Sequence, residues 1–165
     1  MKVLPIGHPL TVQYQSSEFH QLANLLRQQS VDHIGTVLVF TGMAPHALEA
    51  AANRLALDLG MSISRINLQK VSSKYIGETE KNLQRVLGSA AAAHTILLFD
   101  EADALFGNRT SVKDAHDRYD NLDTNYLLEL LESYKGIVVM LAHPSGKAIT
   151  RRSKGRRVVV RFPPR

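Results

Sequence analysis

The sequence predicts an α/β fold in which a parallel β-sheet is covered by helices. Short apolar runs of the length of buried strands alternate along the chain with longer segments of helical periodicity, and this alternation is typical of parallel sheets. The length of 165 residues, with 44% hydrophobic and 21% charged residues, suits one globular domain with a hydrophobic core. No apolar run reaches the roughly 20 residues that cross a bilayer, and cysteine is absent. We therefore expect a soluble, cytoplasmic protein.

The first three elements are expected before residue 60. Residues 17–29 have an amphipathic pattern and are predicted to form a short helix. The continuous apolar run 37–40 is predicted to be a buried strand, and Gly42 ends it. Residues 45–59 are rich in Ala and Leu and are predicted to form a helix that Gly60 closes.

The remainder of the chain continues this alternation. Residues 62–68 alternate between polar and apolar side chains, which is typical of a strand. The apolar residues of 78–93 fall on one face of a helix. Three further strands and one further helix complete the prediction: strand 95–99, helix 118–133, strand 137–141 and strand 158–160.

The positive charge is concentrated at one end of the sequence. The formal net charge is +5, and residues 147–165 contain eight basic side chains and no acidic one, so subtracting these eight leaves −3 for residues 1–146. We expect an N-terminal extension with a short helix over 1–34 and a core over 35–165 that ends in a basic tail from 147. The tail is either a surface for nucleic acid or an acidic partner, or a solvated segment.

A pair of carboxylates follows the apolar run 95–99. Asp100 and Glu101 stand at the point where this predicted strand ends. In nucleotide hydrolases, carboxylates at such a position hold magnesium and polarise a water molecule. Both are therefore candidate catalytic residues, and Asp100 is the candidate metal ligand if a magnesium nucleotide binds. The alternative is a structural role at the strand end, paired with Lys or Arg.

Three segments resemble the AAA family of AAA+ ATPases, in its single-module bacterial type. Residues 74–83 resemble the pore-loop segment and the helix after it, 99–107 resemble the Walker B segment, and 112–119 resemble an insert of the bacterial proteins. The resemblance implies a three-layer αβα P-loop NTPase-like core. Its five-stranded parallel sheet is expected in the order 5-1-4-3-2.

The resemblance also implies roles at four other places. His143 aligns with the polar sensor after the fourth strand, and Arg151 and Arg152 are the nearest candidates for trans-acting arginine fingers. A C-terminal helical lid over the adenine is expected to be absent, because the sequence stops at Arg165. Tyr75 would grip a threaded polypeptide in a pore, or else be a surface aromatic or an oligomer contact. The implied pore-loop residues are Lys74, Tyr75, Ile76 and Gly77.

The implied phosphate loop, residues 42–49, lacks most of its chemistry. The required pattern is Gly, four residues, then Gly-Lys-Ser/Thr. Gly42 is present, but the last three positions are Ala47, Leu48 and Glu49. Leu48 replaces the cation that pairs with phosphates, and Glu49 replaces the magnesium-binding hydroxyl by a negative charge. Two unit charges about 4 Å apart interact by roughly 4 kcal/mol at an effective dielectric of about 20. We therefore expect nucleotide affinity to fall by roughly three to five decades.

The main functional hypothesis is a degenerate AAA domain, a pseudo-ATPase that serves as a protein-binding, regulatory or adaptor module. No cofactor is expected, and the partner would be an intact AAA ATPase or a secretion-system component in a bacterial or phage setting. The alternative is an active AAA+ ATPase that uses Mg-ATP to remodel proteins. A third hypothesis is nucleic-acid binding through the basic tail, which is not favoured. No membrane partner is expected.

Overall fold

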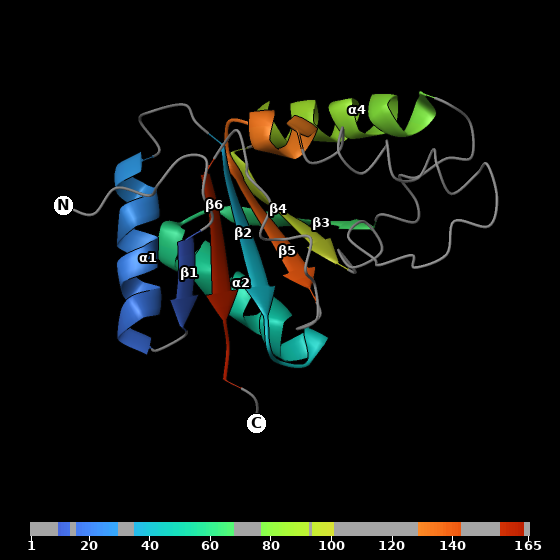
Figure 1. Cartoon of the computed structure of the whole chain (residues 1–165). Helices are drawn as coiled ribbons and strands as arrows, with labels where there is room; N and C mark the ends of the chain where they lie inside the picture. Colours follow the sequence, from blue (N-terminus) through green and yellow to red (C-terminus); the bar gives the residue numbers. More distant parts are fainter. Residues whose placement is uncertain are drawn as a thin grey trace, which may run out of the picture.

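The computed structural model describes residues 10–13, 16–29, 35–67, 77–92, 94–100, 129–142 and 156–163. Within these ranges the chain forms a parallel β-sheet with helices on both faces (Figure 1). Residues 129–133 are helical and are the described part of the helix predicted over 118–133. In chain order the elements are β1 (Leu10–Gln13), α1 (Ser16–Gln29), β2 (Thr36–Thr41), α2 (Pro45–Leu59), β3 (Ser62–Asn67), α4 (Glu78–Ala92), β4 (Thr95–Asp100), β5 (Ile137–Ala142) and β6 (Arg156–Arg161).

The strand order confirms the sheet that the resemblance implied. It is β1-β6-β2-β5-β4-β3, and every pairing is parallel. Strands β2 to β6 are the five predicted strands, and they stand in the predicted order 5-1-4-3-2. β1 is an additional strand from the N-terminal extension, and it pairs with β6 from Leu10↔Val158 to Gln13↔Arg161. Its sequence LTVQ alternates between apolar and polar residues, a short strand signal that was not recognised in the N-terminal extension.

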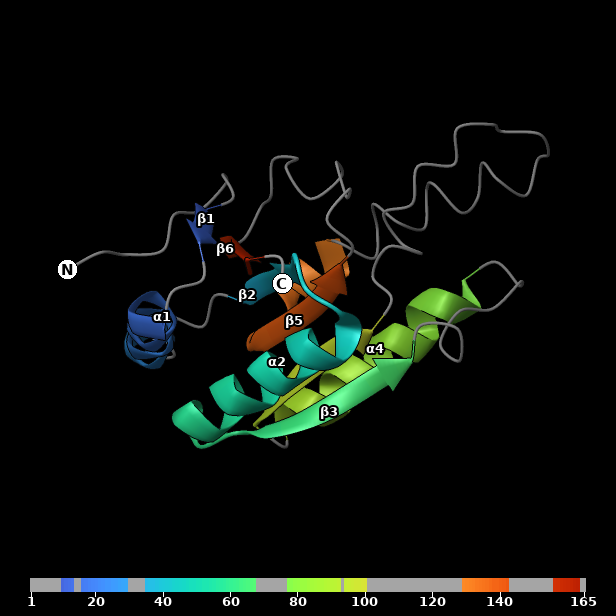
Figure 2. The ribbon, with the colours of Figure 1, turned by 90° about the horizontal axis from the view of Figure 1, so that it is seen from below.

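The central strands are buried on both faces, which explains their continuous apolar runs. Leu38 and Phe40 of β2 pack with α1 and α2 on one face, and Figure 2 shows these two helices along the same side of the sheet. Val37 and Val39 pack on the other face, with α4 and the segment 129–134. The alternation is the two-residue period of a strand, and burial on both faces is usual for covered parallel sheets.

Helix α2 begins and ends as its sequence predicts. Pro45 occupies the first turn, where a missing N–H costs nothing. Gly60 follows the last turn with φ 65°, and its N–H donates to the carbonyl of Leu57 at 3.1 Å. The N–H of Met61 donates to the carbonyl of Ala56 at 3.0 Å, so two carbonyls at the helix end are satisfied.

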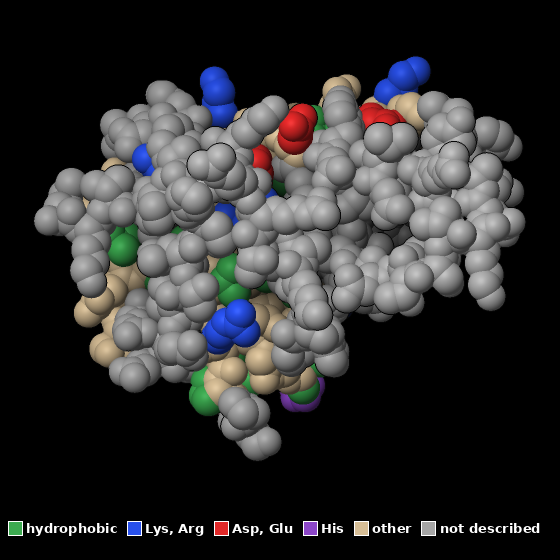
Figure 3. Space-filling view, viewed as in Figure 1, with side chains coloured by type: hydrophobic (Ala, Val, Ile, Leu, Met, Phe, Trp, Pro, Cys, Tyr) green, Lys and Arg blue, Asp and Glu red, His purple; other side chains and the backbone are tan. Residues whose placement is uncertain are grey.

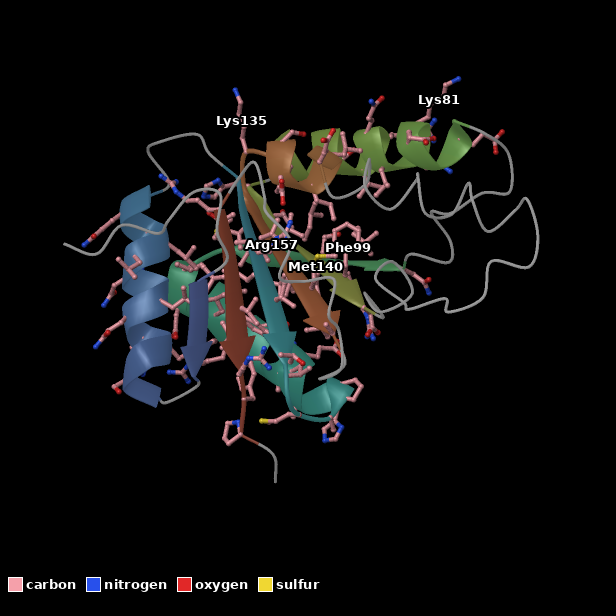
Figure 4. The ribbon with its side chains drawn as sticks, in the orientation of Figure 1. Lys81, Phe99, Lys135, Met140 and Arg157 are labelled. Carbon is pink, nitrogen blue, oxygen red and sulfur yellow. The ribbon has the colours of Figure 1, made fainter. Side chains whose placement is uncertain are left out.

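Strand β6 is longer than predicted, and this places part of the basic tail inside the protein. The prediction was 158–160, whereas the strand runs from Arg156 to Arg161. Arg156 and Arg157 are buried, and Arg157 lies in the interior (Figure 4). The Nη2 of Arg157 donates to Oε1 of Glu132, with only 4% and 6% of the two side chains exposed. These two arginines are therefore not part of an exposed basic surface.

None of the helices in the described ranges combines the length and the apolar character that crossing a membrane requires.

Candidate functional site

The candidate site lies at the carboxyl ends of the parallel strands. Asp100 ends β4 and Gly42 follows β2, while the register places Thr41 beside Ala142 of β5 and Asn67 of β3 beside Asp100. Ligands of open α/β sheets bind at this edge, so the sheet brings the loop 42–49 and Asp100 to the expected place. The other predicted site residues lie outside the described ranges: Glu101, His143, Arg151, Arg152, Lys74, Tyr75 and Ile76.

The loop 42–49 is mostly occupied by the beginning of α2. The helix begins at Pro45, inside the eight-residue window, and its N-cap Ala44 makes no side-chain capping bond. The N–H groups of Ala47 and Leu48 donate to the carbonyl of Ala44, at 2.9 and 3.1 Å. Pro45 has no N–H to offer. In an anion-binding loop the backbone N–H groups point at phosphate oxygens. Here the N–H groups of Ala47 and Leu48 already donate within the first turn of α2.

The side chain of Leu48 faces the core instead of the site. Only 2% of Leu48 is exposed, and it belongs to the core formed by α1, α2 and one face of the sheet. The buried residues of α2 are Leu48, Ala52, Leu55 and Ala56, which follow the helical spacing of an inward face. The position that carries the phosphate-binding lysine in the required pattern is therefore an interior position in this protein.

Gly42 has a geometric role that is independent of phosphate binding. Its φ is 108°, and a Cβ at this position would lie 2.2 Å from the carbonyl oxygen of Phe162. The N–H of Phe162 also donates to the carbonyl of Thr41 at 2.8 Å. The ring of Phe162 packs edge-on against Phe40 and Phe19, with centroids 5.3 and 6.4 Å apart. The chain after β6 is thus fixed against the start of the loop, and glycine permits this close approach.

A guanidinium group joins the two acidic positions of the site. Arg65 of β3 donates from Nη1 to Oε1 of Glu49 at 3.1 Å and from Nη2 to Oδ2 of Asp100. The hydrogen bond and charge of Asp100, and then the charge of Glu49, raise the pKa of Arg65 above its ordinary value. Arg65 therefore keeps its positive charge throughout the accessible pH range. Asp100 is thus paired with an arginine, as expected if its role at the end of β4 is structural.

Arg65 was not singled out from the sequence, although two signals for it existed. The predicted order 5-1-4-3-2 places β3 next to β4, the strand that ends in Asp100. The strand period also places Arg65 and Asn67 on the same face of β3, and Asn67 is the register partner of Asp100. The contact with Glu49 needs the position of the first turns of α2, which no local sequence pattern gives.

Gly77 is the one implied pore-loop residue within the described ranges. It precedes α4 with φ 82°, and its carbonyl accepts the N–H of Lys81 at 3.3 Å. Glu78 and Glu80 lie in the first turn of α4, where acidic side chains complement the helix dipole. Across the described part of the chain, His, Asp and Glu side chains form no group of three or more that is suited to a metal ion.

Comparison with known proteins identifies the family. The family model described as "ATPase family associated with various cellular activities (AAA)" matches residues 46–156. The chain is 34% identical to a vesicle-fusing ATPase of Arabidopsis thaliana over 82 residues, which are 44% of this chain and 11% of that protein. It is 30% identical to an uncharacterised AAA family ATPase of Sinorhizobium fredii over 87 residues, 53% of this chain and 26% of the other.

A third relative is the ATPase family gene 2 protein of Saccharomyces cerevisiae, which is 30% identical over 94 residues, 55% of this chain and 12% of that protein. The matched stretches thus span at most about a quarter of each relative's length. The family match covers well over half of this chain and agrees with the strand order at the site. The chain therefore belongs to the AAA family of ATPases.

Proposed function

We propose that this AAA domain does not turn over ATP and acts as a protein-binding module with a regulatory or adaptor role. The observation that carries the proposal is the guanidinium of Arg65 between Glu49 and Asp100. In P-loop ATPases, magnesium is held by the loop hydroxyl and by the Walker B aspartate. Glu49 and Asp100 occupy these two positions in the sequence pattern, and here a side chain of the protein supplies the positive charge between them.

This arrangement argues against binding of a magnesium triphosphate. A magnesium ion at Asp100 would have to displace a guanidinium that stays charged, and the two cations would repel each other if both remained. The loop adds two further obstacles. The N–H groups of Ala47 and Leu48 are used within the helix, and the side chain of Leu48 is directed into the core. The residues present therefore do not fit a magnesium nucleotide.

Nucleotide titration tests the proposal directly. Calorimetry with Mg-ATP and with Mg-ADP should give no measurable binding to the wild-type chain at micromolar concentrations. The Arg65→Ser/Glu49→Thr variant removes the bridge and restores the loop hydroxyl, and it should still bind far more weakly than an intact family site because the anion nest remains closed. Micromolar affinity of the wild type, together with steady release of phosphate, would overturn the proposal.

The fuller restoration adds Pro45→Gly, Ala47→Gly and Leu48→Lys to the same two substitutions. Gain of nucleotide binding only in this variant would support an intact scaffold whose loop and bridge prevent binding. Thermal melting must accompany it, because Leu48→Lys alters a core position. If the variant with all five substitutions is fully folded and still fails to bind nucleotide, the feature that prevents binding lies elsewhere in the domain.

The proposed partner is a protein, either an intact AAA ATPase or a secretion-system component, and no cofactor is proposed.

An active ATPase is the second candidate function, and one observation favours it. The sheet still carries Asp100 at the end of β4, next to the start of α2, as a nucleotide site requires. It predicts turnover that rises with protein concentration and disappears in Glu101→Gln. No turnover at any protein concentration would count against this candidate.

A further inference from the structure

We propose that the free edge of β3, with the hollow beside it under α4, binds an extended segment of a partner protein. That segment would present an apolar side chain close to a carboxylate. The inference rests on the protein-binding part of the proposed function and assigns it a surface. This surface is distinct from the bridge of Glu49, Arg65 and Asp100, which lies on the opposite face of β3.

The hollow has the form of a binding pocket. Its volume is about 420 Å³, and it lies between α4 and the neighbouring strands β3 and β4. Ile66, Ala90 and Leu97 form apolar walls that are themselves well buried, and Val86 is partly buried beside them. Concave pockets of roughly 300–1,000 Å³ with apolar walls and a few polar groups are the usual form of ligand sites. This hollow can therefore take one or two side chains of a partner.

The strand beside the hollow offers backbone groups for pairing. β3 pairs with β4 from Ser62↔Thr95 to Asn67↔Asp100, and no other strand in the described ranges pairs with its second edge. An edge strand presents unpaired N–H and C=O groups to an added strand. Ser64 and Ile66 of β3 both line the hollow. Alternate side chains of an added strand would enter the same side, because strands that pair share their two-residue period.

The positive charge of Arg85 beside the hollow favours a partner segment that carries a carboxylate. Among the described residues that line it, Arg85 is the one that carries a charge. Arg85 is exposed, and within the described ranges no ion pair of Arg85 is found. A carboxylate beside the apolar side chain of the partner would meet this guanidinium in a charge-assisted contact. The apolar walls favour a protein segment over a phosphate backbone, since a phosphate has no apolar group to place there.

The same helix supplies a matched control. Figure 3 shows charged side chains of both signs along the upper edge of the molecule, where Figure 1 places α4. Lys81 lies one turn before Arg85 on α4, and its side chain points away from the sheet (Figure 4). Lys81→Glu therefore makes the same change of net charge on the same helix as Arg85→Glu, at a residue that does not line the hollow.

The test uses the complete chain and a displayed library of random peptides of about seven residues, the length of an ordinary strand. We expect the selected peptides to share an apolar residue with Asp or Glu one or two positions away. Fluorescence anisotropy then measures the affinity of one selected peptide. Arg85→Glu should weaken it by at least about tenfold through the lost charge contact. Ser89→Phe should do the same by filling the hollow, whereas Lys81→Glu should change it by less than about twofold.

Circular dichroism and thermal melting establish that each variant is folded before its affinity is compared. Hydrogen exchange then identifies the mode of binding. The peptide should slow the hydrogen exchange of those backbone amides within residues 62–67 that face away from β4, and leave the exchange of β5 amides unchanged. Binding that leaves β3 amides unprotected would overturn strand addition.

Peptides without a shared apolar and acidic pattern, or with the same affinity for Arg85→Glu, would overturn the assigned site. Self-association of the wild type that Ser89→Phe abolishes, with no peptide selected, would make a second copy of this chain the occupant and overturn the proposal as stated. None of these measurements involves nucleotide, so their failure is distinguishable from failure of the proposed lack of ATP turnover.

Discussion

Placing a lysine at position 48, where the phosphate-loop pattern has one, should disturb the core before it affects any nucleotide. Leu48 is only 2% exposed and packs in the core beneath α2. Loss of a buried leucine side chain typically costs about 2–5 kcal/mol, and a lysine at this place must also bring its ammonium group out to water. We expect Leu48→Lys to lower the free energy of unfolding by about 3 kcal/mol. For a domain of this size the melting temperature should fall by roughly 6–12 °C.

Leu57→Lys is the matched control, because it makes the same substitution on the same helix. Leu57 is 77% exposed, so its replacement should change the unfolding free energy by less than about 0.5 kcal/mol. Urea denaturation and thermal melting, both followed by circular dichroism, measure the two variants side by side. Equal stability of Leu48→Lys and Leu57→Lys would refute the reasoning. It would mean that position 48 can direct a cation toward the site without loss of packing.

Three further predictions concern stability. Arg157→Met should cost about 3–5 kcal/mol in urea denaturation, because it removes the Arg157 charge from beside the buried Glu132 carboxylate. Adding Glu132→Leu should recover most of that loss, and a double variant less stable than Arg157→Met alone would contradict this. Gly42→Ala should lower the free energy of unfolding by at least about 1–3 kcal/mol, since the φ of Gly42 is 108° and an added Cβ would lie 2.2 Å from a carbonyl oxygen. The control Gly88→Ala lies in open space on α4 and should leave the free energy of unfolding unchanged or raise it by up to about 1 kcal/mol. Equal melting temperatures of the two variants would contradict this prediction. Burial raises the pKa of Tyr134 in the native state. The stabilisation that comes from keeping its phenol neutral should therefore be complete below about pH 10 and be lost as the pH rises through the raised native pKa. In urea denaturation across this range, the unfolding free energy of Tyr134→Phe should fall less steeply with pH than that of the wild type.

The sheet could be predicted from the sequence because its central strands are apolar on both faces. Runs such as 37–40 and 95–99 have no polar alternation, which indicates burial between two helical layers, and both are strands buried on both sides. Helix α2 was predicted with its correct ends because proline and glycine mark them. β1 was missed although its four residues alternate between apolar and polar side chains, and its place beside β6 is a long-range pairing that no local pattern gives.

The chemistry of the site was less predictable than the fold. The burial of Leu48 follows from its helical spacing with Ala52 and Leu55, so the sequence contained the signal for it. The bridge by Arg65 depends on three segments that are distant in the chain and meet only in the folded sheet. Likewise, the burial of Arg157 requires Glu132 as its partner, and a basic run read in isolation suggests a surface. Charged residues are thus the ones for which tertiary pairing overrides the local pattern.

The bridge by Arg65 joins, at the carboxyl edge of the sheet, two elements that magnesium nucleotide joins in P-loop ATPases. In P-loop ATPases, magnesium and phosphate neutralise the Walker B aspartate and connect it to the start of the loop helix. Here Arg65 connects the same two elements, α2 through Glu49 and β4 through Asp100. Replacing the loop hydroxyl by glutamate adds a negative charge that an isolated Asp100 would repel. The guanidinium of β3 compensates for both carboxylates at once. Glu49 and Arg65 are therefore physically linked: Glu49 without Arg65 would place like charges together, and Arg65 without Glu49 would lose one of its two carboxylate contacts in the bridge.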